Sequence, residues 1–184
     1  DFGSDNKNNY LKSLNARNMK KLLLVLLFVP LVSFGQIESV YYTSGASKYE
    51  SKDYYGAIAD YTKAIELNPN NPKTSVAYLK RGDAKYRLKD FNGAIADHTK
   101  AIELNPNNPK TSAAYLNRGD AKYRLKDLDG AMADYSKAIK FDPDYSLAYS
   151  NRGNVKSILG DEYGAIADYT KFTELDPDNP VAFF

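Results

Sequence analysis

Apolar and small residues recur at helical spacing in two neighbouring runs, residues 77–88 and 91–104. The stripe of the first run consists of Ala77, Arg81, Ala84 and Leu88. The stripe of the second run consists of Ala94, Ile95, His98, Ala101 and Ile102. Such spacing is typical of amphipathic helices, so the pattern predicts two helices that each have one face to bury.

Polar residues and prolines mark the ends of these two predicted helices. Asp90 is a good N-cap for the second helix. Asn105 and Pro106 should end it, because the residue before a proline leaves the α region. Asn108 can cap the next helix, and Pro109 suits that helix's first turn. Each unit is therefore helix, short turn, helix, and stacking of units must supply the core.

The helix pair belongs to an internal repeat. Residues 56–90 and 93–127 differ at only three of 35 positions. The differing pairs are Tyr61 and His98, Val76 and Ala113, and Lys80 and Asn117. A fixed period of this length is typical of stacked-repeat proteins, which offer a long curved surface for holding a partner rather than a closed pocket for chemistry.

Four units of this kind can be placed along the chain. They cover residues 38–71, 75–108, 112–145 and 146–179. The first two junctions carry three extra residues, Pro72-Lys73-Thr74 and Pro109-Lys110-Thr111, which should lengthen the following helix. Residues 180–184 look like the start of a further first helix. Because they end in two phenylalanines, we expect a fragment, or another element or a second copy that covers this end.

At this point the residues resemble the tetratricopeptide (TPR) repeat family over roughly residues 38–184. In the second unit, Tyr78 stands for the family's aromatic residue, Gly82 for its glycine, Ala94 and Ala101 for its small residues, and Pro106 for its proline. Equivalent glycines are Gly45, Gly119 and Gly153, and equivalent prolines are Pro69, Pro143 and Pro177. The resemblance implies an all-α fold: an α-solenoid of stacked antiparallel helix pairs in a right-handed superhelix.

Charged residues depart from the family pattern in a regular way. Arg81, Arg118 and Arg152 occupy a position where the family usually has Leu. Lys85, Lys122 and Lys156 occupy one where it often has Tyr. Every second helix also carries an Asp: Asp60, Asp97, Asp134 and Asp168. We expect each Arg to extend along the interhelical groove and pair with an Asp of its own or the preceding second helix, in a structural role.

The start of the chain has a different composition. Residues 1–18 form a polar leader, and residues 19–35 combine two lysines, a short apolar run broken by Pro30 and a small residue at the end. This pattern predicts a secretory signal peptide, with a buried core helix or an uncleaved anchor as the alternatives. The remaining residues, 36–184, form the TPR domain. A cleaved bacterial leader predicts export to the periplasm or cell envelope, with membrane contact only through the signal peptide.

Charge and residue types exclude several kinds of chemistry. Residues 1–35 hold five of the 25 basic and two of the 23 acidic residues, which leaves 20 basic and 21 acidic on the rest. A near-neutral body with mixed signs gives no electrostatic case for nucleic acid. The absence of cysteine from the sequence excludes disulfides, thiolate zinc sites and thiol nucleophiles.

No catalytic or cofactor motif stands out. His98 is the single histidine and occupies a position filled elsewhere by Tyr61, Tyr135 and Tyr169, so we expect a packing residue. Short acidic runs at residues 127–130 and 142–144 lack calcium-loop spacing and suit helix caps. The glycines that recur before an alanine suit close approach rather than phosphate binding. The sequence therefore predicts no enzyme activity, no metal and no cofactor.

The side of the first helices that faces away from the apolar stripe carries a mixed polar and aromatic set. The predicted groove residues are Leu79, Lys80, Asp83, Tyr86, Arg87, Leu116, Asn117, Asp120, Tyr123, Arg124, Asn151 and Asn154. In the TPR family this side lines a concave surface that commonly binds extended peptides or partner helices. The alternative is a solvated face in which Asp83–Arg87 and Asp120–Arg124 are simple i, i+4 pairs.

The resemblance and the groove together predict a non-enzymatic, exported interaction scaffold or adaptor with a protein or extended-peptide partner. One known use of such grooves, the clamp for acidic chaperone tails, needs Asn where this chain has Asp83 and Asp120, so we reject it. Two alternatives remain open: a structural solenoid that self-assembles through its ends, and an accessory region of a larger cell-envelope enzyme.

Overall fold

The structure is a computed structural model that describes residues 34–107 and 110–178. The chain divides into two compact units, Asp1–Gly35 and Gln36–Phe184. The expected signal peptide, the expected cap Asn108 and the expected further helix at residues 180–184 lie outside the described residues.

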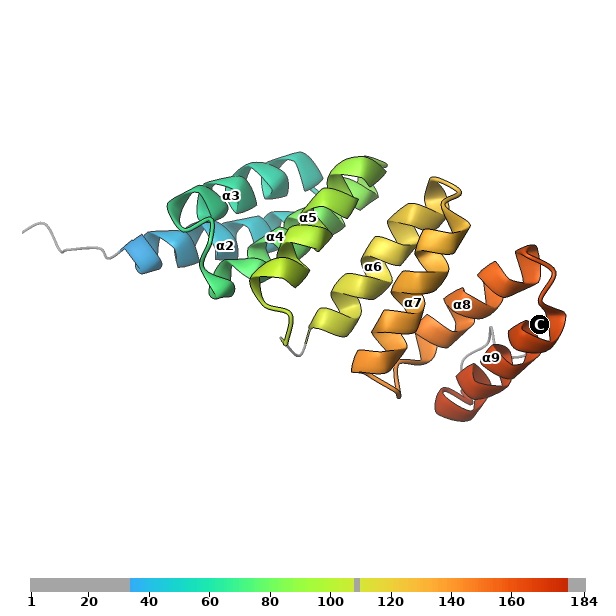
Figure 1. The fold of residues 1–184 in the computed structure, drawn as a ribbon. Helices are drawn as coiled ribbons and strands as arrows, with labels where there is room; N and C mark the ends of the chain where they lie inside the picture. Colours follow the sequence, from blue (N-terminus) through green and yellow to red (C-terminus); the bar gives the residue numbers. More distant parts are fainter. Residues whose placement is uncertain (1–33, 108–109, 179–184) are drawn as a thin grey trace, which may run out of the picture. The chain divides into compact units, whose positions relative to one another are not determined.

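The described residues form α-helices and one short 3-10 helix, and no strand occurs among them (Figure 1). In chain order they are α2 (Phe34–Glu50), α3 (Tyr54–Leu67), η1 (Pro72–Thr74), α4 (Ser75–Arg87), α5 (Phe91–Leu104), α6 (Thr111–Arg124), α7 (Leu128–Phe141), α8 (Ser146–Ile158) and α9 (Glu162–Leu175). Within the second unit, α4 packs on α5, α6 on α7 and α8 on α9, and each pair also contacts the next. The predicted all-α solenoid of stacked helix pairs is therefore confirmed.

An aspartate caps each second helix. The side chains of Asp53, Asp90, Asp127 and Asp161 each accept a hydrogen bond from the backbone N–H of the glycine three residues later. A Cβ on any of these glycines would collide with the capping carboxylate. The expected cap at Asp90 and the expected close approach of the glycines are both confirmed, and the acidic run that begins at Asp127 is a helix cap.

The turn inside each pair requires a left-handed residue. Lys52, Lys89 and Lys126 adopt φ 64°, and Gly160 adopts φ 82° at the same position of the fourth pair. After Lys89, the Asp90 N–H donates to the Lys85 carbonyl at 2.9 Å, which closes the end of α4. The turn is therefore tight enough to set the two helices antiparallel.

The core of each pair is built from small residues around one ring. Alanines of α3, α5, α7 and α9 are buried, and the largest fully buried side chains include Tyr61, His98 and Tyr135. Each ring lies against the glycine of its own first helix. A Cβ on Gly119 would come within 2.7 Å of the Tyr135 ring, and one on Gly82 within 2.7 Å of His98. The expectation that His98 is a packing residue is thus confirmed.

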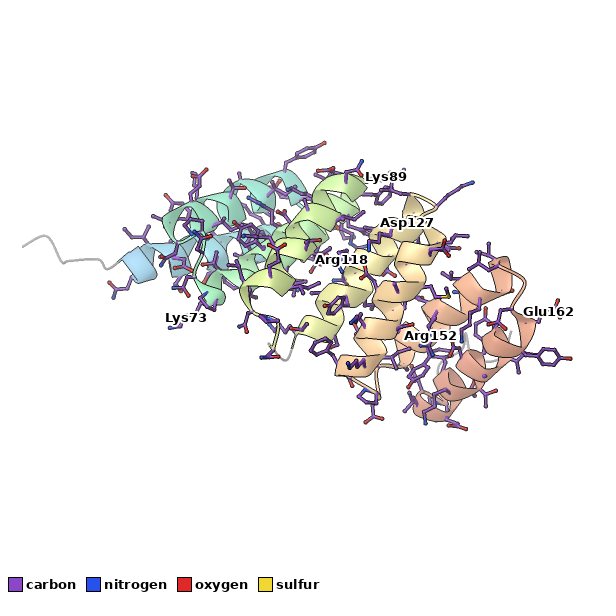
Figure 2. All side chains as sticks on the ribbon, in the orientation of Figure 1. Lys73, Lys89, Arg118, Asp127, Arg152 and Glu162 are labelled. Atoms are coloured by element: carbon purple, nitrogen blue, oxygen red, sulfur yellow. The ribbon has the colours of Figure 1, made fainter. Side chains whose placement is uncertain are left out.

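The expected arginine–aspartate pairs are present in three helix pairs. Arg118 Nη2 and Asp134 Oδ1 are 2.6 Å apart, and Arg118 Nε donates to Asp134 Oδ2 at 2.8 Å, so the pair is bidentate. The partner is always the Asp of the same repeat, with Arg81–Asp97 and Arg152–Asp168 at 2.7 Å. Figure 2 shows Arg118 and Arg152 among the packed side chains of the stack.

Each arginine also reaches the preceding repeat. Arg118 Nη1 donates to the Thr99 hydroxyl at 3.0 Å, and Arg81 Nη1 donates to Thr62 at 3.0 Å. A lysine adds a second cation to each aspartate, as Lys122 does to Asp134 at 2.8 Å. In the first pair Ser44 and Lys48 replace these groups and bind Asp60, both at 2.6 Å. One guanidinium therefore links three helices.

Two details differ from the sequence expectation. The first helix of the second repeat was expected over residues 77–88 but α4 is Ser75–Arg87. The insertion Pro72–Thr74 does not simply lengthen α4; it forms the separate turn η1, capped by the Asn71 side chain. The reason is a hydrogen bond at 2.7 Å from the Thr74 hydroxyl to the Asn68 carbonyl, which holds this turn against the end of α3.

The close packing of glycine on the ring gives a prediction for Gly119→Ala. Helix propensity alone would make this change stabilising by about 1 kcal/mol. Because the new Cβ would lie 2.7 Å from the Tyr135 ring, we expect instead a loss of about 1–3 kcal/mol in the free energy of unfolding, measured by urea denaturation. A gain in stability would contradict the packing described here.

The buried arginine network gives a prediction for Asp134→Ala. This change leaves Arg118 and Lys122 without their shared anion, so we expect a loss of about 3 kcal/mol in the free energy of unfolding. Asp129→Ala on the exposed start of the same helix is the control and should change stability by less than about 0.5 kcal/mol. Equal effects of the two substitutions would show that the network adds nothing.

Candidate functional site

Two adjoining pockets lie along the first helices of the middle repeats. The first pocket has a volume of about 200 Å³ and is lined by Tyr49, Asp83, Tyr86, Arg87, His98, Asn117 and Asp120. The second pocket has a volume of about 230 Å³ and is lined by Tyr86, Asp120, Tyr123, Arg124, Tyr135, Asn151 and Asn154. Because Tyr86 and Asp120 belong to both, the pockets form one groove.

Most of the predicted groove residues line these pockets. The nine are Asp83, Tyr86, Arg87, Asn117, Asp120, Tyr123, Arg124, Asn151 and Asn154. Lys80 lies beside them, with its Nζ 3.4 Å from Asp83 Oδ2. The structure therefore brings together the polar residues that the helical spacing selected.

Leu79 and Leu116 do not belong to the groove, and this part of the expectation was wrong. Leu79 is 5% exposed and packs with Ala101, Ile102 and Ala114, while Leu116 is 4% exposed in the next cluster. Both leucines lie at the edge of the first helix where the following repeat covers it. Their apolar side chains bury there instead of facing the groove.

Amide–carboxylate hydrogen bonds connect successive repeats along the groove floor. Asn117 Nδ2 donates to Asp83 Oδ1 at 2.8 Å, and Asn151 Nδ2 donates to Asp120 Oδ1 at 2.8 Å. The alternative of a solvated face with i, i+4 ion pairs placed these carboxylates with Arg87 and Arg124. The carboxylates instead bind the next repeat, and the two arginines are exposed at the rim.

Burial gives both groove carboxylates unusual electrostatics. Burial raises the pKa of Asp83 above its ordinary value, although Lys80 and Asn117 act in the opposite direction. Burial likewise raises the pKa of Asp120, against the hydrogen bonds from Tyr135 and Asn151. Both groups are therefore acceptors for which additional hydrogen-bond donors or cations are favourable.

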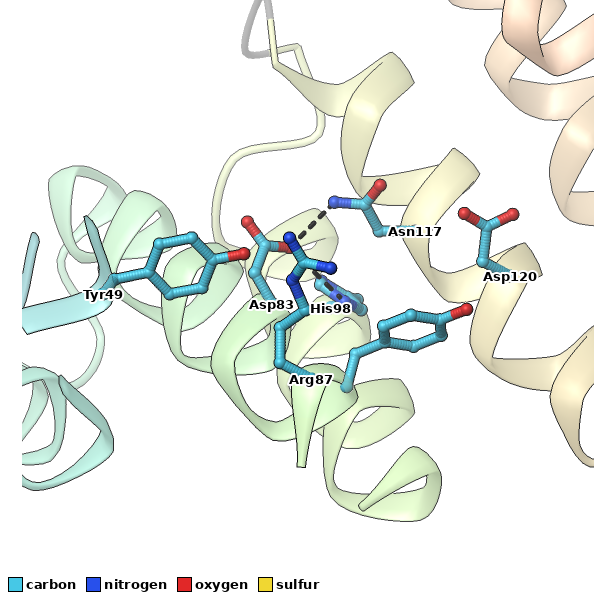
Figure 3. A pocket seen from close by; sticks show the side chains of 7 residues that line it. Tyr49, Asp83, Arg87, His98, Asn117 and Asp120 are labelled. Atoms are coloured by element: carbon cyan, nitrogen blue, oxygen red, sulfur yellow. Dashed lines mark hydrogen bonds and ion pairs between the residues drawn. The ribbon is translucent and has the colours of Figure 1, made fainter. Parts of the chain in front are cut away.

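The two pockets differ most at the ring beneath the carboxylate. The Tyr135 hydroxyl donates to Asp120 Oδ1 at 2.9 Å, and the Tyr169 hydroxyl donates to Asn154 at 2.8 Å in the last repeat. In the first pocket His98 takes this place, and its Nε2 is 3.8 Å from Asp83 Oδ1, too far for a hydrogen bond (Figure 3). Both His98 ring nitrogens are buried without a hydrogen-bond partner.

Three residues that line the pockets were not among the predicted groove residues. Tyr49 from α2 contributes a ring to the first pocket, and His98 and Tyr135 form the floors of the two pockets. Tyr49 occupies the same repeat position as Tyr86 and Tyr123, so alignment of the weaker first repeat could have found it. His98 and Tyr135 were predicted only as packing residues. A ring that packs against one helix can also form the floor of a groove, and the helical spacing does not show this.

Two further properties of the described part of the chain bear on function. Among residues 34–107 and 110–178, no three histidine or acidic side chains are placed as a metal site requires. Within the same ranges, no helix is both long and apolar enough to cross a membrane.

Comparison with protein families identifies the repeats. Models described as tetratricopeptide repeat match residues 39–71, 75–108 and 147–179, and a model described as TPR repeat matches residues 119–160. Together these matches cover most of the chain, and the chain belongs to the tetratricopeptide repeat family. A comparison with curated protein sequences gives no significant match.

Solved structures share the fold. A crystal structure of the MamA protein is 27% identical, with a TM-score of 0.71 over 80% of this chain and 78% of that one. The TPR domain of Arabidopsis OM64 is 30% identical, with a TM-score of 0.63 over 68% of this chain and 98% of that one. The first TPR of Spaghetti (RPAP3), bound to the HSP90 peptide SRMEEVD, is 30% identical, with a TM-score of 0.62 over 68% and 94%.

The environment of His98 gives a prediction for its titration. Burial lowers the pKa of His98 from 6.5 to about 4, so the folded protein holds a neutral ring while the unfolded chain takes up a proton below pH 6.5. Stability should therefore fall as the pH drops from 6.5 towards 4, by on the order of 3 kcal/mol.

NMR titration of this single imidazole measures the pKa directly. His98→Tyr is the control for stability, because it restores the ring of the other repeats and removes the titrating group. Its stability should fall less than that of the natural chain over the same pH range. A His98 pKa near 6.5 would contradict the buried, neutral ring.

Proposed function

We propose that this chain is a non-enzymatic interaction scaffold or adaptor that holds an extended peptide segment of a partner protein in the groove. The observation that carries the proposal is the continuity of the two pockets, which share Tyr86 and Asp120 and follow consecutive first helices. A row of similar subsites at the repeat spacing suits an extended chain better than a compact small molecule.

The groove offers the groups that such a peptide needs. Arg87 and Arg124 are exposed at the rim and can donate to backbone carbonyls. Tyrosine rings supply apolar contact area together with hydroxyl groups for hydrogen bonding, and Tyr86 lies at the junction of the pockets. Peptide backbone would thus be bound by the rim, while side chains entering the two pockets would set the choice of partner.

The first TPR of Spaghetti (RPAP3) is bound to an HSP90 peptide, which supports peptide binding as a use of this fold. The charge of that peptide, however, does not suit the groove of this chain. The peptide SRMEEVD in that structure carries three acidic residues. In this chain the carboxylates of Asp83 and Asp120 line the groove. Like charges would repel, so an acidic tail of that kind is not the partner that we propose.

We further propose that the protein works outside the cytoplasm, in the periplasm or cell envelope of a bacterium. Support for this comes from residues 19–35, whose two lysines, apolar run and small final residue fit a secretory leader. Self-assembly through the end of the stack is the competing function. Light scattering at several protein concentrations would detect it beside the binding experiment.

The binding experiment pans a library of random dodecapeptides against the purified protein and measures the affinity of each selected peptide. A groove variant replaces Tyr86, Arg87, Tyr123 and Arg124 by Ala. We expect it to bind selected peptides about a hundredfold or more weakly, because buried aromatic and arginine contacts dominate such interfaces.

A matched control variant removes two tyrosines and two cationic side chains from exposed positions on the second helices, replacing Tyr55, Tyr163, Lys137 and Lys140 by Ala. It should bind as tightly as the natural chain. Peptides that bind the groove variant unchanged, or that are lost only in the control, would overturn the proposed function.

A further inference from the structure

The two pockets provide an internal comparison, because the first helices that carry Asp83 and Asp120 are nearly identical in sequence. In the second pocket, Asp120 Oδ1 accepts hydrogen bonds from both Tyr135 and Asn151. In the first pocket, Asp83 Oδ1 accepts the equivalent bond from Asn117, but the hydroxyl donor is missing. His98 stands at that position with its Nε2 3.8 Å away. Asp83 accepts a bond from Lys80 at 3.4 Å on its other oxygen, but it lacks the hydroxyl donor that Asp120 has.

The groups around Asp83 suit a cation. Asp120 brings a second carboxylate to the same pocket, and the tyrosines Tyr49 and Tyr86 line it with aromatic rings. Aromatic rings attract cations through their π-faces, and carboxylates accept hydrogen bonds from them. A neutral imidazole has an acceptor nitrogen and adds no positive charge. The buried part of the first pocket therefore offers negative charge and hydrogen-bond acceptors to a ligand.

Two cationic side chains of the chain itself lie near this pocket, and neither fills it. Lys80 pairs with Asp83 Oδ2 at 3.4 Å, but its half-buried side chain does not line the pocket. Arg87 is exposed at the rim, where the hydroxyl of Tyr49 raises its pKa. Solvent screens an exposed rim charge more effectively than the carboxylates below it. A ligand cation that reaches the floor therefore gains more from Asp83 than it loses to Arg87.

We propose that the first pocket binds the ammonium group of a lysine side chain carried by the peptide in the groove, with Asp83 as its principal acceptor. This inference rests on the proposed function and adds the specificity of one subsite. A lysine ammonium is a compact group with three donors on a flexible stem. Its stem would pack between Tyr49 and Tyr86, and its donors would supply Asp83 with the bond that Tyr135 gives Asp120.

The second pocket does not take the same group. Its carboxylate already holds a tyrosine hydroxyl and an amide, and its floor is a tyrosine ring. The pockets differ in the ring at the floor, His98 against Tyr135, and in the second polar group, Asp120 against Asn154. Exchange of the ring at His98 is therefore expected to remove the lysine preference of the first pocket without altering the packing of the stack.

The test uses the selected dodecapeptides and the purified full chain. We expect the peptides to share one lysine, and replacement of that lysine by norleucine to weaken binding about tenfold or more, because the stem is kept and only the charge is lost. Asp83→Asn and His98→Tyr should each weaken the lysine peptide about tenfold or more. Both should weaken the norleucine peptide clearly less than the lysine peptide, and the melting temperature of each variant checks its fold.

A gain-of-function variant completes the design. Tyr135→His together with Asn154→Asp in the His98→Tyr background should restore the lysine preference at the second pocket, with the peptide shifted by one subsite. Selected peptides without a shared lysine, or lysine peptides that bind the Asp83→Asn and His98→Tyr variants unchanged, would overturn the inference. Either result would leave the proposed function intact. The proposed function fails only if the natural chain does not bind peptides in the groove.

Discussion

The largely buried guanidinium of the second, third and fourth repeats is the interaction on which the rest of the structure depends. Arg118 bonds both carboxylate oxygens of Asp134 in its own repeat and the Thr99 hydroxyl of the preceding one. The apolar core around it consists largely of alanines, and small side chains alone fix the spacing of helices poorly. Directional hydrogen bonds that link three helices supply that register. These bonds stabilise the folded state mainly because breaking one would leave a buried ion without its partner, which is strongly unfavourable.

This frame separates the two sides of each first helix. One side carries the arginine and glycine that bind the second helices, and the other side carries Asp83 and Asp120 with their amide partners from the next repeat. The groove therefore runs across repeats that the buried network already holds together. A change of one ring, as at His98, alters the chemistry of a single pocket while the packing against Gly82 is kept.

Much of this arrangement could be predicted from the sequence. The bounds of α5, the cap at Asp90 and the arginine–aspartate pairs follow from helical spacing, capping chemistry and charge. Other features could not be read from one repeat. The left-handed turn falls on Lys89, a residue with no preference for that conformation, and only Gly160 at the same position of the last repeat points to it. Leu79 was misplaced because spacing gives the face of a helix but not which neighbour covers its edge.

Hydrogen–deuterium exchange, with and without a selected peptide, tests most directly the claim that partners bind the free side of the first helices. The account predicts slower exchange in the last turns of α4 and α6, which carry Asp83, Arg87, Asp120 and Arg124, and little change in α5 and α7. Slower exchange confined to α5 and α7, with α4 and α6 unchanged, would place the partner on the opposite surface and contradict the account.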